Sequence, residues 1–295
     1  MLRKLAVAFD KNNPTPPSTI QTLRKLREAC KAYGVDVSLI SVYSKPQIEK
    51  YDALWLRQPA DTGSPALDIA LRFAQEGKPV LDDLLSVKQC TDKVYMQALL
   101  KASGVSLPRS HFLSARSDLQ AIADDLGYPL VLKLPDSDFS RGVFKVDSMR
   151  AFKALSKKLL EKRALLLVQE FVATNFDWRI GVLDNTAIFA CQYDLVSGHW
   201  QILKHHNDGS FEEGSGKVVD IKEAPPEVIR QALKAAGSVG NGLYGVDLKE
   251  TADRVVVIEV NDNPNIEWDF EASVNPVWQP LCSWFATQLA ARECN

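Results

Sequence analysis

The chain has 295 residues, of which 46% are hydrophobic and 24% are charged, with a formal net charge of -2 at pH 7. This length is enough for two or three compact units, and the charge argues against a nucleic-acid-binding arm or a patch for anionic membranes. No apolar run approaches the roughly 18 residues that a membrane-spanning helix requires, which predicts a protein without a membrane partner.

The cysteine pattern and the first residues indicate the compartment. The five cysteines are scattered and include no CxxC pair. This usage is typical of reduced cytosolic thiols and predicts neither a disulfide frame nor a zinc site. The start MLRKLAVAFDKNN has a short apolar part and no small-residue cleavage site, so it indicates a first strand rather than a signal peptide. We therefore expect a cytoplasmic protein.

The first part of the chain alternates strand-like and helix-like runs. The expected strands are residues 4–9, 36–42, 52–58 and 79–83, and the expected helices are residues 18–34 and 64–77. Ser18 is the candidate N-cap of the first helix, and Gly34 is its stop. This βαβ rhythm predicts a small, mainly parallel sheet in an N-terminal domain of residues 1–88.

The rest of the chain predicts two further lobes. A helix is expected at residues 91–104, followed by strands 128–134, 142–146 and 164–172 and a helix at 148–162. Antiparallel strands are expected at 177–195, 199–205 and 216–221, a helix at 226–242, a hairpin of 243–248 with 254–260, and a packing helix at 275–293. The α/β chain would thus end in two α+β lobes, residues 89–169 and 170–295.

Polar side chains interrupt the apolar strand in RVVVIEVNDNPN, residues 254–265. Glu259 and Asn261 are two residues apart, so they face the same side of a strand. Asp247 on the preceding strand joins them if the two strands pair with an even index sum. Two carboxylates that close need a cation between them, and Mg²⁺ takes few protein ligands when phosphates and waters complete its shell. The alternative is that Glu259 pairs with a basic neighbour and Asn261 begins an Asx turn.

A lysine lies in the apolar strand YPLVLKLP. A buried ammonium such as that of Lys133 is costly unless it meets an anion, and the small residues Ser137, Ser140 and Gly142 that follow could let backbone groups approach a phosphate. The alternative is an edge-strand lysine whose ammonium reaches water. Lys93 on the expected helix is equally open to a surface position.

Taken in order, these segments resemble the ATP-grasp superfamily, most closely its RimK-type branch of amino-acid ligases, relatives of glutathione synthetase. The resemblance covers nearly the whole chain, and its segments are LVLKLPDSDFSRGVFKV, LLVQEFV, DWRIGVLDNTAIFA and the hairpin GLYGVDLK…VVVIEVNDNPNIEWD. It implies the ATP-grasp fold, in which two α+β lobes clasp ATP behind a small α/β domain.

The resemblance also implies the reaction. A carboxylate–amine ligase of this kind forms an amide through an acyl phosphate, consumes ATP, and joins a carboxylate substrate to an amine substrate such as an amino acid, a peptide or a carrier protein. The alternatives are an ATP-grasp kinase that stops at a phosphorylated product and a non-catalytic ATP-binding protein. Similar ligases are usually dimers, so the resemblance allows a homodimer.

The resemblance assigns the phosphate and metal roles residue by residue. Asp247, Glu259 and Asn261 would hold Mg²⁺, for which Mn²⁺ is a substitute, between the ATP phosphates. Lys93 and Lys133 would neutralise the phosphates, which supplies the anion that a buried lysine needs. The loop with Ser137, Ser140 and Gly142 would close over the nucleotide.

The remaining roles follow in the same way. Backbone groups of Glu170 and Val172 would bind the adenine edge, and Phe171 would shape the pocket. Asp177 would accept hydrogen bonds from the ribose. Arg179 would face the reacting carboxylate or its acyl phosphate, because a guanidinium fork matches that charge.

Two positions depart from the family pattern, and one loop remains for substrate. The phosphate loop is poor in glycine, and Gln201 lies where the family usually has an arginine, just after an aromatic residue in the strand that leads to the substrate side. Lys204 or His205 is the candidate substitute, although a lysine does not reproduce the fork of an arginine. The loop WLRQPADTGSP, residues 55–65, follows a strand of the N-terminal domain and is the candidate for substrate contact.

Overall fold

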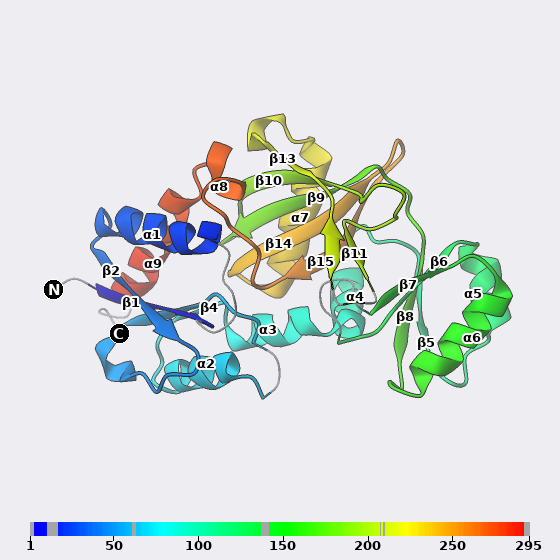
Figure 1. Cartoon of the computed structure of the whole chain (residues 1–295), viewed down its shortest axis with the longest axis horizontal. Helices are drawn as coiled ribbons and strands as arrows, with labels where there is room; N and C mark the ends of the chain where they lie inside the picture. The colour runs from blue at the N-terminus through cyan, green and yellow to red at the C-terminus, as the bar shows by residue number, and fades with distance from the viewer. Residues whose placement is uncertain are drawn as a thin grey trace.

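The computed structural model describes residues 3–10, 17–60, 63–136, 142–206, 208 and 210–291. Figure 1 shows a parallel sheet at the N-terminal end of the molecule, a small antiparallel sheet at the other end, and a larger antiparallel sheet between them. None of the helices in these ranges is long and apolar enough to cross a membrane.

The N-terminal domain is a four-stranded parallel sheet in the order β2-β1-β3-β4. Its elements are β1 (Arg3–Phe9), α1 (Pro17–Lys31), β2 (Val35–Ser41), η1 (Ile48–Lys50), β3 (Ala53–Leu56), α2 (Pro65–Gln75) and β4 (Val80–Leu81). The predicted parallel sheet is confirmed, and its inner strands β1 and β3 are largely buried because helices cover both faces. The first helix begins at Pro17, one residue before the expected cap Ser18.

The central lobe is an antiparallel sheet in the order β5-β8-β6-β7. It consists of β5 (Ser110–Leu113), α5 (Leu119–Leu126), β6 (Leu130–Lys133), β7 (Val143–Val146), α6 (Met149–Leu160) and β8 (Leu166–Glu170). Leu130 and Leu132 pack against the two helices in one core. Because side chains alternate along a strand, Val131 and Lys133 face the opposite side, toward the larger sheet.

The C-terminal lobe is the larger antiparallel sheet, in the order β13-β10-β9-β14-β15. Its strands are β9 (Phe176–Leu183), β10 (Thr186–Asp194), β13 (Gly216–Val219), β14 (Leu243–Glu250) and β15 (Val255–Asn261). The helix α7 (Pro226–Val239) covers one face, where it packs on Ile180 and Val246. Asp177, Arg179 and Asp247 therefore face away from the helix.

Two helices, α3 (Leu84–Thr91) and α4 (Lys93–Ala102), lie between the N-terminal domain and the central lobe. The C-terminal lobe also contains the short elements β11 (Leu203–His205), β12 (Phe211–Glu213), η2 (Ile221–Glu223) and α8 (Glu271–Val274). Met96 and Leu100 of α4 belong to the core of the C-terminal lobe rather than to that of the central lobe. The domain boundary at residue 88 stays a prediction.

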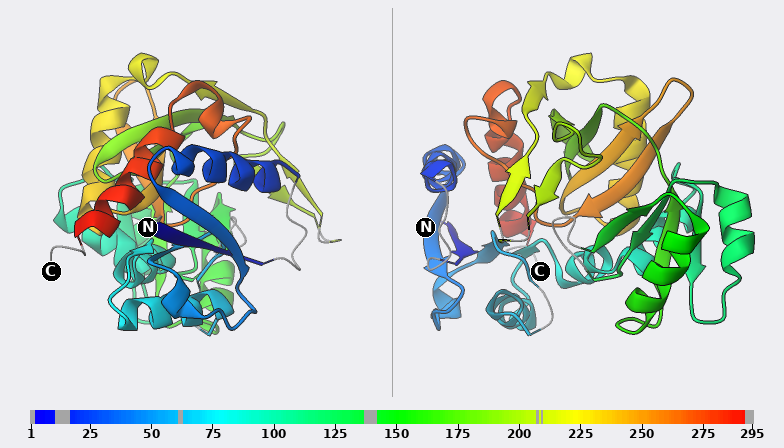
Figure 2. Two further views of the ribbon diagram at one scale, coloured as in Figure 1. Left: turned by 90° about the vertical axis from the view of Figure 1, so that its left-hand side faces the viewer. Right: turned by 45° about the vertical axis from the view of Figure 1, so that its right-hand side comes forward.

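The last helix, α9 (Trp278–Ala291), returns to the N-terminal domain. Both views in Figure 2 place it beside α1, and Leu281 and Phe285 lie in one core with Leu5 and Leu26.

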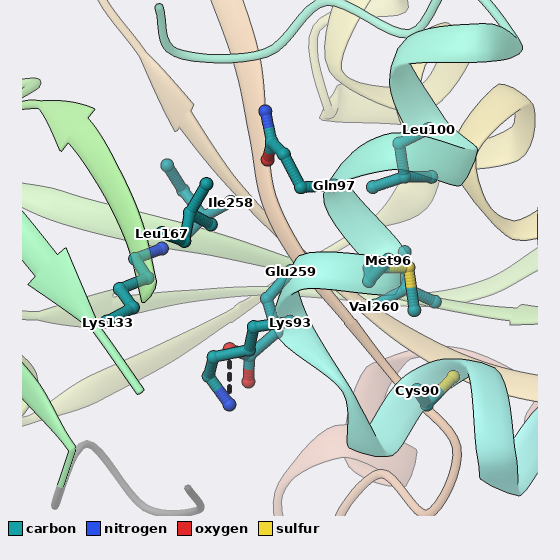
Figure 3. A pocket seen from close by; sticks show the side chains of 10 residues that line it. All are labelled: Cys90, Lys93, Met96, Gln97, Leu100, Lys133, Leu167, Ile258, Glu259 and Val260. Carbon is teal, nitrogen blue, oxygen red and sulfur yellow. Dashed lines mark ion pairs between the residues drawn. The ribbon is translucent and has the colours of Figure 1, made fainter. Parts of the chain in front are cut away.

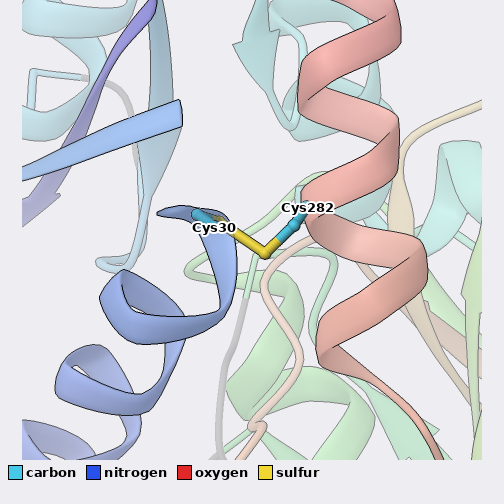
Figure 4. Close-up of a disulfide and its surroundings, with 2 residues drawn as sticks. All are labelled: Cys30 and Cys282. Carbon is cyan, nitrogen blue, oxygen red and sulfur yellow. A yellow bond between two sulfur atoms is a disulfide. The ribbon is translucent and has the colours of Figure 1, made fainter. Parts of the chain in front are cut away.

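The two terminal helices are joined covalently. Cys30 and Cys282 form a disulfide with a Cα–Cα distance of 5.1 Å, and both residues are buried (Figure 4). The prediction that the cysteines are reduced thiols without a disulfide is therefore wrong for this pair. The two positions are 252 residues apart in sequence, and only the packing of α9 on α1 brings them together.

Candidate functional site

A β-bulge places Glu259 on the face of the sheet that carries Asp247. The register pairs Asp247 with Glu259 and Leu248 with Val257, so Ile258 is an extra residue in β15. Val255 and Val257 face the core. Regular alternation would turn Glu259 into that core as well, and the bulge turns it to the opposite side. The expected pairing of Asp247 with Glu259 is confirmed.

Asp247 lies at the centre of a polar cluster. Arg179 lies opposite it on β9 and donates from Nε to Oδ1 at 2.7 Å and from Nη2 to Oδ2 at 2.9 Å. The Nδ2 of Asn261 donates to the same Oδ2 at 3.2 Å. Burial raises the pKa of Asp247 in spite of the guanidinium. Burial would lower the pKa of Arg179, but Asp247 holds it above its usual value.

Glu259 and two lysines, Lys93 and Lys133, line a small pocket between the lobes, and Lys93 is the one that pairs with Glu259 (Figure 3). The Nζ of Lys93, at the first position of α4, lies 3.6 Å from Oε2 of Glu259. Burial alone would raise the pKa of Glu259, but the ammonium groups of Lys93 and Lys133 hold it below its usual value. The structure thus brings both predicted lysines to the β14–β15 hairpin that carries Asp247 and Glu259.

Lys133 is a buried ammonium that does not reach water. It is only 6% exposed, at the end of β6 on the face opposite the lobe's own core. Burial lowers its pKa to about 8, although Glu259 opposes that shift. The alternative of an edge-strand lysine in contact with water is excluded.

The segment after β8, which is predicted to bind the adenine edge, leaves one backbone amide without a backbone hydrogen bond among the described residues. The Phe171 amide donates to Pro129 O at 3.2 Å, whereas no backbone bond within the described part of the chain uses the amide of Val172. The carboxylate of Glu170 points elsewhere: it accepts from Arg109 Nε at 3.0 Å and from Arg254 Nη2 at 2.9 Å. Only the backbone of Glu170 can therefore serve an adenine edge.

Two aromatic rings and a lysine surround this segment. The rings of Phe171 and Trp200 pack edge to face, with 6.0 Å between their centres. Nζ of Lys145 lies 4.9 Å from the centre of the Phe171 ring. Lys145 was not expected in the site. The sequence could have indicated it. Lys145 lies opposite Val131 in the pairing of β7 with β6, and Val131 faces the larger sheet.

Asp177 has a partner that sequence reasoning missed. Lys249 forms an ion pair with its carboxylate and also donates to Thr174 Oγ1 at 2.8 Å. Lys249 is two residues after Asp247 on β14 and so shares its face. The alternation of side chains along β14 could therefore have predicted that Lys249 lies in the site.

The structure does not gather every expected residue. Gly142 lies before β7, where its carbonyl accepts from the Leu134 amide, and Oε1 of Gln201 accepts from Nε2 of His199 at 3.3 Å. Lys204 lies in the β11–β12 hairpin, where its Nζ is 3.5 Å from Glu212. Ser137 and Ser140 lie outside the described residues.

The donor set fits a hard divalent cation. No group of three or more His, Cys, Asp or Glu side chains suited to a metal occurs in the described ranges. The candidate site instead offers the carboxylates of Asp247 and Glu259 and the amide of Asn261. Mg²⁺ uses such a small set when phosphates and waters complete its octahedron. Mg²⁺ at these residues stays a prediction.

Comparison with known proteins agrees with this geometry. Relatives include a probable alpha-L-glutamate ligase of Cellvibrio japonicus, 26% identical over 84% of this chain and 85% of the relative. A probable alpha-L-glutamate ligase 2 of Shewanella amazonensis is 25% identical over 94% of this chain and 95% of the relative.

Solved structures share the fold. The D-alanine–D-alanine ligase of Bacillus anthracis complexed with ATP superimposes with a TM-score of 0.71 and 17% identity, covering 99% of both chains. A RimK domain ATP-grasp protein of Sphaerobacter thermophilus gives 0.68 and 19%, covering 95% of this chain and 98% of the other. The model of the RimK-like ATP-grasp domain matches residues 90–275, more than half of the sequence. The chain therefore belongs to the RimK-like ATP-grasp family and is an ATP-grasp ligase.

Proposed function

We propose that this ligase joins a substrate carboxylate to the amine of L-glutamate, with ATP as the phosphoryl donor and an acyl phosphate as the intermediate. The chemistry is carboxylate–amine ligation. The choice of L-glutamate rests on the glutamate ligases among the relatives, which match most of the chain.

One observation carries the proposal. Asp247 and Glu259 lie opposite each other, and Glu259 shares a pocket with Lys93 and Lys133 of two other elements. Adjacent carboxylates and lysines at a junction of lobes suit a triphosphate with its cation better than they suit an apolar ligand.

Each residue then has a role in phosphoryl transfer, which depends mainly on position and charge. Lys93 and Lys133 would neutralise the ATP phosphates, and Asp247, Glu259 and Asn261 would hold Mg²⁺. Mg²⁺ held there would offset the charge of the phosphates.

Arg179 would orient the reacting carboxylate. Its Nε and Nη2 hold Asp247, and Nη1 stands outside that bidentate pair. A guanidinium held on one edge offers a fixed donor on the other, which is the geometry that binds an acyl phosphate oxygen. No nucleophilic serine or cysteine is needed.

The test is a coupled assay. The protein is incubated with ATP, Mg²⁺, L-glutamate and a panel of acids that contains the other amino acids and short glutamyl peptides. We expect phosphate release that depends on both substrates, and a product heavier by one glutamyl residue in mass spectrometry. A phosphorylated product without an amide would indicate the kinase alternative, and ATP binding without turnover would indicate a binding protein.

A further inference from the structure

Arg57 lies where the N-terminal domain meets the turn that follows β15. It follows β3, and its amide donates to Ala8 O at 2.8 Å, which fixes the backbone at the carboxyl end of the parallel sheet. Ligands of parallel α/β sheets bind at this edge. The edge faces the turn that leaves β15, because Nη1 of Arg57 donates to Asn263 Oδ1 at 2.7 Å and to Pro264 O at 2.9 Å.

This guanidinium has no anionic partner in the described part of the chain. Nη1 meets only the two neutral oxygens, no hydrogen bond uses Nε or Nη2, and no carboxylate lies within 4.0 Å. One face of the guanidinium lies 5.0 Å from the centre of the buried Trp55 ring. Burial lowers the pKa of Arg57, against the longer-range attraction of Glu267, Glu271 and Asp82, none of which is hydrogen-bonded to it in the described ranges.

Arg57 is half-buried, so its guanidinium loses part of its hydration and gains most from an anion that takes up its remaining donors. Arginine remains charged, and its free Nε and Nη2 form the fork that binds a carboxylate with two hydrogen bonds. The stacked ring and the two fixed acceptors hold that fork in one orientation. The missing partner is therefore a carboxylate supplied from outside the chain.

The position of Arg57 relates it to the reacting centre. A Cβ placed on Gly245 of β14 would lie 2.8 Å from the Pro264 ring and 3.7 Å from Arg179 Cδ. Pro264 thus packs on the same glycine that Arg179 flanks, while its carbonyl is bound by Arg57. The two arginines stand on either side of one turn.

We propose that Arg57 binds the carboxylate that the amine substrate keeps, the α-carboxylate of L-glutamate, and thereby selects an amino acid over a simple amine. This assignment rests on the proposed ligase function. The carboxylate that reacts must approach the phosphates near Lys93 and Lys133. A carboxylate that survives the reaction must instead be held away from them by a fixed cation, and Arg57 belongs to a different domain from that pocket.

The experiment compares L-glutamate with its α-amide and its γ-amide as amine substrates in the phosphate-release assay. We expect the wild type to prefer L-glutamate over the α-amide by about 10- to 100-fold in kcat/KM, the effect of charge-assisted hydrogen bonds. In Arg57→Gln the KM for L-glutamate should rise by a similar factor, the preference should vanish, and the KM for ATP should change less than twofold. Arg57→Lys should give intermediate values, since it keeps the charge and loses the fork.

Arg230→Gln is the matched control, because it removes an exposed guanidinium paired with Glu227 on α7. It should behave as the wild type. If Arg57→Gln keeps the wild-type preference for L-glutamate over the α-amide, the assignment is wrong and the ligase function stands. A preference for the γ-carboxylate lost in Arg57→Gln would also overturn the α-carboxylate assignment. If Arg57→Gln does not fold, equal use of L-glutamate and the α-amide by the wild type overturns it. A wild type that releases no phosphate with L-glutamate overturns the proposed function itself.

Discussion

Asp247 and Glu259 lie directly opposite each other on paired strands, and each carboxylate is held by a different cation. Arg179 binds Asp247 through two hydrogen bonds of 2.7 and 2.9 Å, whereas Lys93 lies 3.6 Å from Glu259. Two carboxylates so close would repel each other without these partners.

Replacement of one carboxylate should stop the reaction without unfolding the protein. Glu259→Gln keeps the shape and removes the charge between Lys93 and Lys133, so we expect ATP-dependent phosphate release to fall about 100-fold. The midpoint of thermal unfolding should shift little. The control is Asp253→Asn, which alters a carboxylate in the turn of the same hairpin that hydrogen-bonds only Thr251 nearby. Equal loss in both variants would contradict a role in catalysis.

The pKa of Lys133 predicts a pH dependence. At a pKa of about 8, the ammonium is lost as the pH rises through this value. Since the protonated form is the one that attracts phosphates, kcat/KM for ATP should decline above about pH 8. Lys133→Arg should remove the decline, because its guanidinium keeps its proton there, and Lys157→Arg on the surface of α6 should leave it unchanged.

Stability should move in the opposite direction over the same pH range. The folded pKa of Lys133 is about 8 and the ordinary value is 10.5, so the unfolded chain binds more protons between these limits. The contribution of this lysine to the free energy of unfolding therefore rises with pH in that window. Urea titrations of the wild type and Lys133→Met at pH 8 and pH 10 measure it. A larger stability gain in the variant than in the wild type would contradict the assigned pKa.

Lys249 should control nucleotide affinity. It holds Asp177 together with Thr174, so Lys249→Met releases the carboxylate that is expected to bind the ribose. We expect the Kd of a non-hydrolysable ATP analogue, measured by calorimetry, to rise about tenfold, the usual effect of losing one charged hydrogen bond. Lys222→Met, at an exposed position of η2, is the control. An unchanged Kd would remove Lys249 from the site.

The disulfide should contribute to stability. It closes a loop of 252 residues, for which the chain-entropy model gives about 5 kcal/mol. Cys282→Ala should therefore lower the free energy of unfolding by several times more than Cys191→Ala, which removes a buried thiol that is not in a disulfide. Thiol labelling of the denatured wild type checks the bond. Identical unfolding curves with and without a reductant would contradict it.

The pairing of β14 with β15 and the shared face of their polar residues could be predicted from the sequence because the signal is local. Asp247 and Glu259 fall on consecutive strands, and Glu259 and Asn261 share a face by simple alternation. The bulge at Ile258 could not be predicted in the same way, because it breaks the alternation on which the prediction depends. Apolar residues fill nearly every position of RVVVIEV, so the sequence does not show which residue is the extra one.

Contacts between distant segments were beyond such reasoning. The disulfide depends on α9 returning to α1, and the bonds of Arg57 depend on the turn after β15 reaching the N-terminal sheet. The loop that contains Arg57 was predicted as a substrate contact from its place after a strand, but its partners were not. A residue pattern predicts which face of a helix or strand is buried and where the element ends. It does not predict how two domains pack against each other.

The shared core of the first and last helices has a mechanical consequence. Leu5 and Leu26 of the N-terminal domain, Phe189 of the larger sheet and Phe285 of α9 belong to one hydrophobic cluster, while the central lobe has a core of its own. Two of the three parts thus share a core and a disulfide, whereas the central lobe is packed separately. We therefore expect the central lobe to move most when a nucleotide enters or leaves, so that the change in distance between labels on α6 and α7 should exceed that between labels on α1 and α7.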